Sequence, residues 1–307
     1  MGKINKLYVT ILFAISLAAC GGKKQVGNGL ITIIEDREGP EIKEDDFASI
    51  TYAEKTEDGR LISGSYDYDY RPTLVFREKP YFKGDFFDAL GHLTEGDSAI
   101  IKISLDSLRK TGHVKDTIST DKYRIYYVRV NEVVARGDLN DSLFNVNIEA
   151  LKKREAEKAK SAEGSNIRAY MASRKIKSLQ RSPGLDYVIV KDGSGTKPSV
   201  GDTVIVNYTA RTLTGKIFET TLTDSAKKAG IYRASRKYVP SRVPVLSGTQ
   251  LSGFGEAAGL FPAGTKAMLI IHSSRAYGGG LYRKLQPYTT VICDLEVQRI
   301  IPKKIKS

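Results

Sequence analysis

The stretch AYGGGLYRKLQPYTTVICDLEVQRII, residues 276–301, decides the fold class. Its glycine triplet could let backbone amides approach a phosphate, but a nucleotide-binding loop lies between a strand and a helix and usually carries Gly-Lys-Ser/Thr. After these glycines come Val291, Cys293, Leu295 and Val297, which alternate with more polar residues as in a half-buried strand. The loop therefore joins strand to strand, and the sequence predicts an antiparallel sheet rather than a phosphate-binding loop.

A faint internal repeat extends this pattern to most of the chain. Residues 29–65 parallel residues 184–221, each giving a strand, a charged loop, a second strand that ends in Tyr and a turn through Gly. Residues 86–103 parallel residues 254–271, each giving a short apolar-faced helix, a turn through Gly and a buried strand. This order predicts an α+β fold with two domains, each an antiparallel sheet with a short helix on one face.

A helical linker is expected between the two copies, because residues 139–179 are rich in Ala, Lys, Glu and Arg and nearly free of strand formers. Gly164 is expected to interrupt this helix, and Ser165 to cap the helix that follows. The second apolar stripe either packs on its own domain or forms the seam of a homodimer. The two stripes consist of Phe144, Ile148 and Leu151, then Ile167, Tyr170 and Met171.

The N-terminus has the features of a secretory signal. Lys3 and Lys6 precede an apolar run that is too short for a stable membrane anchor and ends in small residues. The sequence LAAC at residues 17–20 resembles the bacterial lipobox, which implies lipidation of Cys20 at the start of the mature protein. The alternative is an ordinary signal peptide with an incidental cysteine. Neither Asp nor an acidic run follows Cys20, and resemblance to bacterial sorting rules then implies an outer-membrane position facing the periplasm.

Charge and cysteine content limit the classes of partner and site. The formal net charge of +13 becomes +11 without residues 1–19, because that segment holds two lysines and no acidic residue. An exported lipoprotein meets little nucleic acid, so anionic membrane surfaces or acidic polypeptides are the expected partners. Cys293 has no internal disulfide partner if Cys20 carries lipid. No Cys/His cluster has the spacing of a metal site, and no cofactor is expected.

Residues 182–301 resemble the FKBP-type peptidyl-prolyl cis/trans isomerases. The motifs GDTVIVNYTARTLTGKIF, SGFGEAAGL, AGTKAMLIIHSSRAYGG and LQPYTTVICDLEV occur in that family's order and at compatible spacings. The resemblance implies an isomerase that acts on proline-containing polypeptides through an apolar pocket. The implied catalytic residues are Tyr208, Phe218, Glu219, Leu251, Phe254 and Tyr277, and the implied substrate-binding residues are Val243, Val245, Leu285 and Cys293.

The resemblance also implies roles for these residues. Phe254 is expected to form the pocket floor, Leu251 to offer its backbone N–H, and Tyr277 to donate its hydroxyl to the substrate carbonyl. No nucleophile is needed for this chemistry. His272 beside Ser273 raises hydrolysis as an alternative, but the sequence offers no oriented acidic partner, so a structural role is expected for both residues.

Several positions depart from the family's pattern. Glu219 stands in place of Asp, Phe254 in place of Trp, Cys293 in place of a pocket aromatic, and Val243 or Val245 in place of Phe. The long segment between Phe218 and Val243 is basic, and is either a solvated loop or a clamp for acidic polypeptides. Its cations are Lys227, Lys228, Arg233, Arg236, Lys237 and Arg242.

The first copy is expected to keep the scaffold and lose the site. Ile62 and Ser63 stand where the family has Phe-Asp, no Tyr-Gly pair matches Tyr277, and Phe86 alone is retained. The tyrosines of the stretch SYDYDYRP form either a peptide-gripping surface or an ordinary exposed edge. They are Tyr66, Tyr68 and Tyr70.

These observations give one expected organisation and two candidate functions. The domains are a signal peptide at 1–19, a tether at 20–28, a degenerate FKBP-like domain at 29–137, a helical linker at 138–181, an isomerase domain at 182–302 and a basic tail at 303–307. The leading function is a lipid-tethered prolyl isomerase of the cell envelope that helps unfolded exported polypeptides to fold. The alternative is a non-catalytic FKBP-like chaperone or assembly scaffold that binds peptides without turnover.

Overall fold

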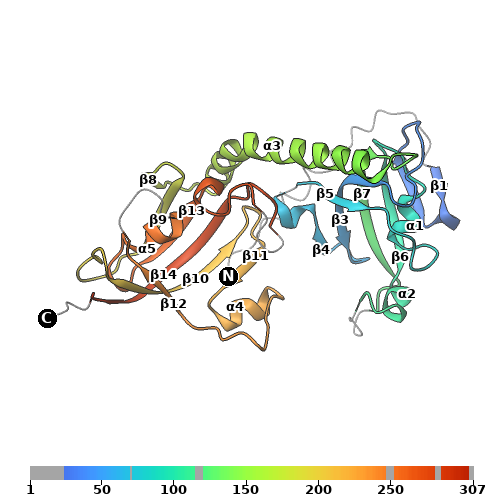
Figure 1. The fold of residues 1–307 in the computed structure, drawn as a ribbon. Coiled ribbons are helices and arrows are strands. Elements are labelled where there is room, and N and C mark those ends of the chain that lie inside the picture. Colours follow the sequence, from blue (N-terminus) through green and yellow to red (C-terminus); the bar gives the residue numbers. More distant parts are fainter. Residues whose placement is uncertain (1–23, 70, 115–119, 247–251, 281–284, 304–307) are drawn as a thin grey trace.

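In the computed structural model, two units built on antiparallel sheets lie at the two ends of one long helix (Figure 1). The structure describes residues 24–69, 71–114, 120–246, 252–280 and 285–303. Every strand pair in both sheets is antiparallel, so the predicted α+β fold class with two sheet-and-helix units is confirmed. Cys20 and Leu251 lie outside the described residues.

The first unit is a seven-stranded sheet within the described residues. Its order is β1-β2-β6-β7-β3-β4, with β5 paired to β3. The strands are β1 (Lys24–Val26), β2 (Ile31–Glu35), β3 (Phe47–Lys55), β4 (Leu61–Gly64), β5 (Thr73–Phe76), β6 (Ser98–Ser104) and β7 (Tyr123–Val134). The short helices are η3 (Gly27–Gly29), η4 (Ser65–Tyr68), α1 (Phe86–Leu90) and α2 (Leu105–Lys110).

The second unit repeats this topology strand for strand. Its order is β8-β9-β13-β14-β10-β11, with β12 paired to β10. The strands are β8 (Leu179–Ser182), β9 (Leu185–Lys191), β10 (Thr203–Arg211), β11 (Ile217–Thr220), β12 (Ser241–Pro244), β13 (Lys266–Ile271) and β14 (Val291–Ile301). The short helices are α4 (Thr223–Lys228), α5 (Gly253–Ala258) and η5 (Ser273–Arg275).

The turns and cores follow the sequence pattern. Gly96 and Gly264 introduce β6 and β13 with φ of 89° and 84°, a backbone conformation that favours glycine. The alternation predicted for β14 is confirmed, because its four alternating residues all enter the buried core of the second unit. These are Val291, Cys293, Leu295 and Val297. Each unit therefore has its own apolar core.

Helix α3 (Asp141–Ser173) runs without a break, which corrects the expected interruption at Gly164. Asn140 caps its start by accepting a hydrogen bond from the backbone N–H of Leu143 at 2.9 Å. Ser165 is no cap, since its hydroxyl donates to the carbonyl of Ala162 within the helix at 2.7 Å. A helical glycine costs only about 1 kcal/mol. Packing of both halves of the helix outweighs that cost.

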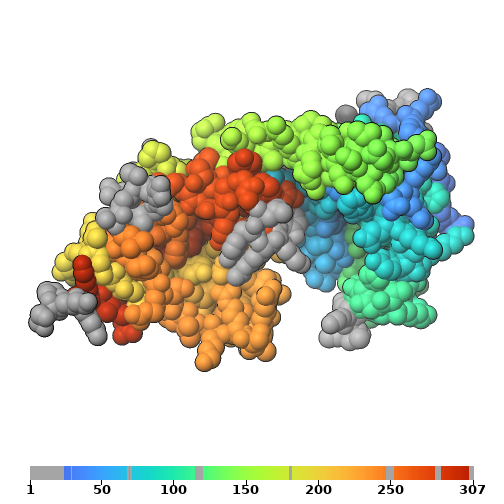
Figure 2. Space-filling view, in the orientation of Figure 1, coloured from blue at the N-terminus to red at the C-terminus, as the bar shows by residue number. Residues whose placement is uncertain are grey.

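The two apolar stripes of α3 pack on different units. Phe144, Ile148 and Leu151 join Phe47 of β3 in one buried cluster. Ile167, Tyr170 and Met171 pack with Ile270 of β13 and Ile292 of β14. The second stripe is thus covered by the chain's own second unit, which is the first of its two predicted alternatives. Figure 2 shows α3 lying along one side of both units, with the molecule hollowed between them on the opposite side.

None of the helices in the described part of the chain is long and apolar enough to cross a membrane.

Candidate functional site

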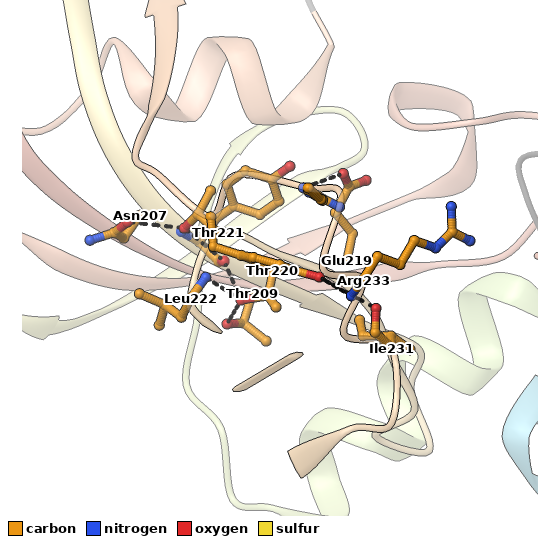
Figure 3. Close-up of polar contacts among 11 residues, drawn as sticks. Asn207, Thr209, Glu219, Thr220, Thr221, Leu222, Ile231 and Arg233 are labelled. Atoms are coloured by element: carbon orange, nitrogen blue, oxygen red, sulfur yellow. Dashed lines mark hydrogen bonds and ion pairs between the residues drawn. The ribbon is translucent and has the colours of Figure 1, made fainter. Parts of the chain in front are cut away.

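The candidate site is built on the edge of the second sheet, where β10 pairs with β11. Thr221 holds both backbone groups of Tyr208: its hydroxyl accepts from the Tyr208 N–H at 2.9 Å, and its N–H donates to the Tyr208 carbonyl at 3.0 Å. The hydroxyls of Thr220 and Thr209 hydrogen-bond to each other at 2.8 Å, and the hydroxyl of Thr221 donates to the side-chain oxygen of Asn207 at 3.0 Å (Figure 3). This polar network fixes Tyr208 beside the residues of β11.

Four aromatic side chains pack at this edge. The rings of Tyr208 and Phe254 meet edge to face, with centroids 5.0 Å apart, and those of Phe218 and Tyr277 do the same at 6.2 Å. Phe254 lies on α5, whose first turn is capped by the hydroxyl of Ser252. All four aromatic residues are partly buried against the core of the second unit. The arrangement is an apolar wall that carries two phenol groups.

Tyr277 is held by backbone bonds on both of its sides. The carbonyl of Ser273 accepts from the N–H of Ala276 at 2.9 Å and from the N–H of Gly278 at 2.8 Å. Gly278 has φ of 60°, so a glycine suits the turn directly after Tyr277. Its carbonyl accepts from the N–H of Tyr288 at 2.7 Å, which closes the loop.

Charged groups reach the same edge. Glu219 is 8% exposed, and its carboxylate accepts a hydrogen bond from Arg236 at 3.2 Å. Burial, and after it the negative charge of Glu219, raise the pKa of Tyr208 to about 12. Tyr208 therefore stays a neutral phenol near neutral pH. Arg236, one of the six cations of the basic segment, is committed to this ion pair.

The four residues expected to bind substrate lie at different depths in the second unit. Val243 and Val245 pack on the core that includes the aromatic wall, and Cys293 is fully buried in it. Leu285 is buried at the far end of the Tyr277 loop. Burial raises the pKa of the Cys293 thiol, so it remains protonated and behaves as a small apolar group.

Residues 194–298 match the family model described as "FKBP-type peptidyl-prolyl cis-trans isomerase". The chain carries an FKBP-type domain. Two relatives match at 30% identity: the "Outer membrane protein MIP" of Legionella longbeachae over 150 residues, and the "FKBP-type 22 kDa peptidyl-prolyl cis-trans isomerase" of Escherichia coli over 119 residues. These matches span 48% and 38% of this chain. They span only 58% and 50% of the two relatives.

Solved structures of FKBP proteins also resemble the chain. The crystal structure of FkpA from Escherichia coli aligns with 54% of this chain and 76% of its own, at 23% identity and a TM-score of 0.37. A peptidyl-prolyl cis-trans isomerase from Pseudomonas syringae aligns with 47% of this chain and 95% of its own, at 27% identity and a TM-score of 0.36.

Helix α3 brings to the second unit an acidic group that the sequence did not single out. Glu163, from α3, places a carboxylate oxygen 3.1 Å from Nδ1 of His272, so the statement that His272 lacks an oriented acidic partner is wrong. The hydroxyl of Ser273 donates to the same carboxylate at 2.7 Å instead of to the histidine. A hydrolytic triad needs the serine hydroxyl on the imidazole, so the three residues do not form one. The charged face of α3 gave no signal that singled out Glu163.

The first unit retains more aromatic residues at the corresponding place than motif matching found. Tyr52 pairs with Val128 as Tyr208 pairs with Leu295, which makes Tyr126 the counterpart of Cys293. The ring of Phe86 lies 5.3 Å from that of Tyr126 and 6.4 Å from that of Tyr52. Phe86 is therefore not the single survivor of the first copy.

One tyrosine of the SYDYDYRP stretch contacts the second unit. The hydroxyl of Tyr66 donates to the carbonyl of Thr214 at 2.6 Å, so Tyr66 is an interdomain contact. Tyr70 lies outside the described residues. A cavity of about 360 Å³ also lies at this junction, between α3 and both units, and is separate from the aromatic wall. Across the described ranges, no three His, Cys, Asp or Glu side chains gather as a metal site would require.

Proposed function

We propose that the chain is a peptidyl-prolyl cis/trans isomerase that acts on proline-containing segments of exported polypeptides. The observation that carries the proposal is the aromatic wall of Tyr208, Phe218, Phe254 and Tyr277 within the FKBP-type domain. An apolar wall with phenol donors suits a reaction that moves no proton and breaks no covalent bond.

The chemistry follows from the amide bond itself. Its rotational barrier of ~18–20 kcal/mol arises from resonance that places negative charge on the oxygen, and water favours that planar form. A dry apolar pocket removes this advantage and leaves the twisted form relatively more stable. In the proposal, Phe254 supports the proline ring with Phe218 beside it, and Tyr277 donates its hydroxyl to a carbonyl of the twisted form.

A protease-coupled assay with short X-Pro peptides tests this proposal on the purified full chain. We expect turnover above the uncatalysed rate, and we expect Phe254→Leu to reduce kcat/KM. Phe86→Leu is the matched control, because Phe86 sits at the corresponding place of the first unit. A rate for the wild-type chain that equals that of buffer would contradict the isomerase proposal.

The aromatic group of the first unit supports a second candidate function, in which the chain binds unfolded polypeptides without isomerising them. Its group of Tyr52, Phe86 and Tyr126 offers apolar rings but has no counterpart of Tyr277. Suppression of aggregation of a proline-free unfolded protein, measured for the wild type and for Tyr277→Phe, separates the two functions. Holding that persists in Tyr277→Phe belongs to this second function.

We further propose that a lipid on Cys20 tethers the chain to the cell envelope, in an outer membrane and facing the periplasm. Support comes from the LAAC sequence at residues 17–20 and from the relative named as an outer membrane protein. Metabolic labelling with a radioactive fatty acid tests the tether. Label should enter the wild-type chain and not Cys20→Ser, and an unlabelled wild-type chain would rule the lipid out.

A further inference from the structure

The helix that joins the two units sends one carboxylate into the base of the Tyr277 loop. Glu163 of α3 is 3% exposed. One of its oxygens accepts from the Ser273 N–H at 2.6 Å and from the Thr290 hydroxyl at 2.8 Å. The other accepts from the Ser273 hydroxyl at 2.7 Å and lies 3.1 Å from Nδ1 of His272. A carboxylate offers about four acceptor positions, and three of them accept hydrogen bonds from Ser273 and Thr290 here.

These donors come from the two ends of a single loop. Ser273 follows β13 after one residue, and Thr290 directly precedes β14. The chain between them carries Tyr277. Both Ser273 and Thr290 are 2% exposed, and the carboxylate of Glu163 satisfies their donors. Glu163 therefore closes the loop at its base from outside the sheet.

A second step connects this closure to Tyr277. The N–H and the hydroxyl of Ser273 both bind Glu163, while its carbonyl holds the N–H groups of Ala276 and Gly278. Those two amides flank Tyr277. The position of the Ser273 backbone therefore influences the backbone on both sides of the tyrosine.

We propose that Glu163 is a positioning residue for Tyr277, through which the linker helix fixes the loop of the isomerase pocket. This inference rests on the proposed function, in which Tyr277 donates its hydroxyl to the substrate. Hydrogen bonds to a buried carboxylate are stronger than neutral ones, and a buried donor that loses its partner is destabilised. Without Glu163, the phenol of Tyr277 samples more positions. In positions where its hydroxyl cannot reach the carbonyl of the twisted peptide, it does not speed up isomerisation.

Steady-state kinetics on the purified full chain give the first test. For Glu163→Gln we expect kcat to fall about tenfold while KM changes less than about twofold, since only the transition-state contact is lost. Glu157→Gln is the matched control: Glu157 lies on the exposed face of the same helix, and its rate should equal that of the wild type. Thr290→Val removes a single donor without a change of shape and should lower kcat, whereas Thr290→Ser keeps the hydroxyl and should restore it.

A double-mutant cycle distinguishes positioning from general stability. If Glu163 acts through Tyr277, then Glu163→Gln should lower kcat by less than about twofold in a Tyr277→Phe background. Full additivity of the two changes would overturn the proposal.

Hydrogen exchange gives a readout that needs no turnover. We expect the amides of Ala276 and Gly278 to exchange at least about tenfold faster in Glu163→Gln, or in Thr290→Val if the first variant does not fold. Unchanged exchange would overturn the positioning role even if the wild-type chain is an active isomerase. Faster exchange in a chain without turnover would sink the proposed function and leave Glu163 as the residue that orders the loop.

Discussion

At the scale of single residues, burial decides what the polar groups of the aromatic wall can do. Burial and the neighbouring Glu219 raise the pKa of Tyr208, whose neutral phenol is hydrogen-bonded to the Glu219 carboxylate, so this residue adds no charge to the apolar site. The Cys293 thiol, where the family has an aromatic ring, likewise stays protonated because burial raises its pKa. The wall therefore differs from the family's pattern in volume and keeps its apolar character.

In the proposed mechanism, the hydroxyl of Tyr277 hydrogen-bonds to the substrate only when the peptide bond is twisted. Loss of the hydroxyl should therefore slow the reaction more than it weakens substrate binding. We expect Tyr277→Phe to reduce kcat/KM by about one to two decades, at ~1.4 kcal/mol per decade, with most of the loss in kcat. The protease-coupled assay measures both constants.

Tyr187→Phe is the control for this change. Tyr187 packs edge to face on Phe261 at 5.1 Å in the same core, away from the aromatic wall, and its loss of a hydroxyl should leave the rate unchanged. Equal rates for Tyr277→Phe and wild type would remove the phenol from the mechanism.

At the scale of elements, α3 packs on both units through two separate segments of its sequence. Its first stripe packs on the first unit and its second stripe on the second unit, with a charged stretch between them. Gly164 lies at the start of the second stripe, directly after Glu163. A break there would turn the Glu163 carboxylate away from Ser273, so the continuity of the helix is part of the site.

Replacing Gly164 by alanine should strengthen the helix. A methyl group there meets only the end of Arg168, at 3.5 Å, and the backbone is helical. We expect Gly164→Ala to raise the free energy of unfolding by about 0.5–1 kcal/mol, through the lost flexibility of the unfolded chain. Denaturant unfolding followed by circular dichroism measures the change.

Gly59 is the matched control, in the turn between β3 and β4. It also has open space around it, but its φ of 85° is one that side chains rarely adopt. Gly59→Ala should therefore lower the free energy of unfolding. A loss of stability in Gly164→Ala would mean that the helix bends at this residue in solution.

The elements and the aromatic wall could be predicted because their signals are local. Alternation marked β14, a glycine marked the turn before β13, and motif order singled out Tyr208, Phe218, Phe254 and Tyr277, which pack against one core. Glu163 could not be found in this way, because it meets Ser273 across 110 residues of chain and stands among many exposed charges. The uninterrupted helix was missed for a related reason: local propensity disfavours Gly164, and tertiary packing overrides it.

At the scale of the whole molecule, the two units touch directly as well as through α3. Thr214, in the turn between β10 and β11, donates its hydroxyl to the Tyr66 carbonyl at 2.7 Å and its N–H to Asp69 at 3.0 Å. Lys216 pairs with Asp67 at 3.1 Å in the same contact. Arg71 binds the Pro287 carbonyl near the end of the Tyr277 loop. The first unit thus contacts both the turn before β11 and the segment before β14.

Asp69 gives this contact a dependence on pH. Burial raises its pKa above the usual value of 3.8, and the bonds from Thr214 offset part of that rise. A group whose pKa is higher in the folded state contributes stability below its unfolded pKa and loses that contribution as pH rises through the folded value. Ionisation of Asp69 is therefore unfavourable for the contact between the two units.

Asp69→Asn should consequently be more stable than the wild type at pH 7. Asparagine keeps the acceptor for the Thr214 N–H and tolerates the left-handed backbone of this residue, whose φ is 57°. The difference in free energy of unfolding between variant and wild type should shrink as pH falls and vanish by about pH 3, where the carboxyl is protonated in both states. Urea unfolding at a series of pH values measures it.

Asp67→Asn is the control from the same contact: it loses the ion pair to Lys216, so it should be slightly less stable than the wild type at pH 7. A variant at residue 69 that is less stable than wild type at pH 7 would show that the charge of Asp69, through Arg71, holds the two units together.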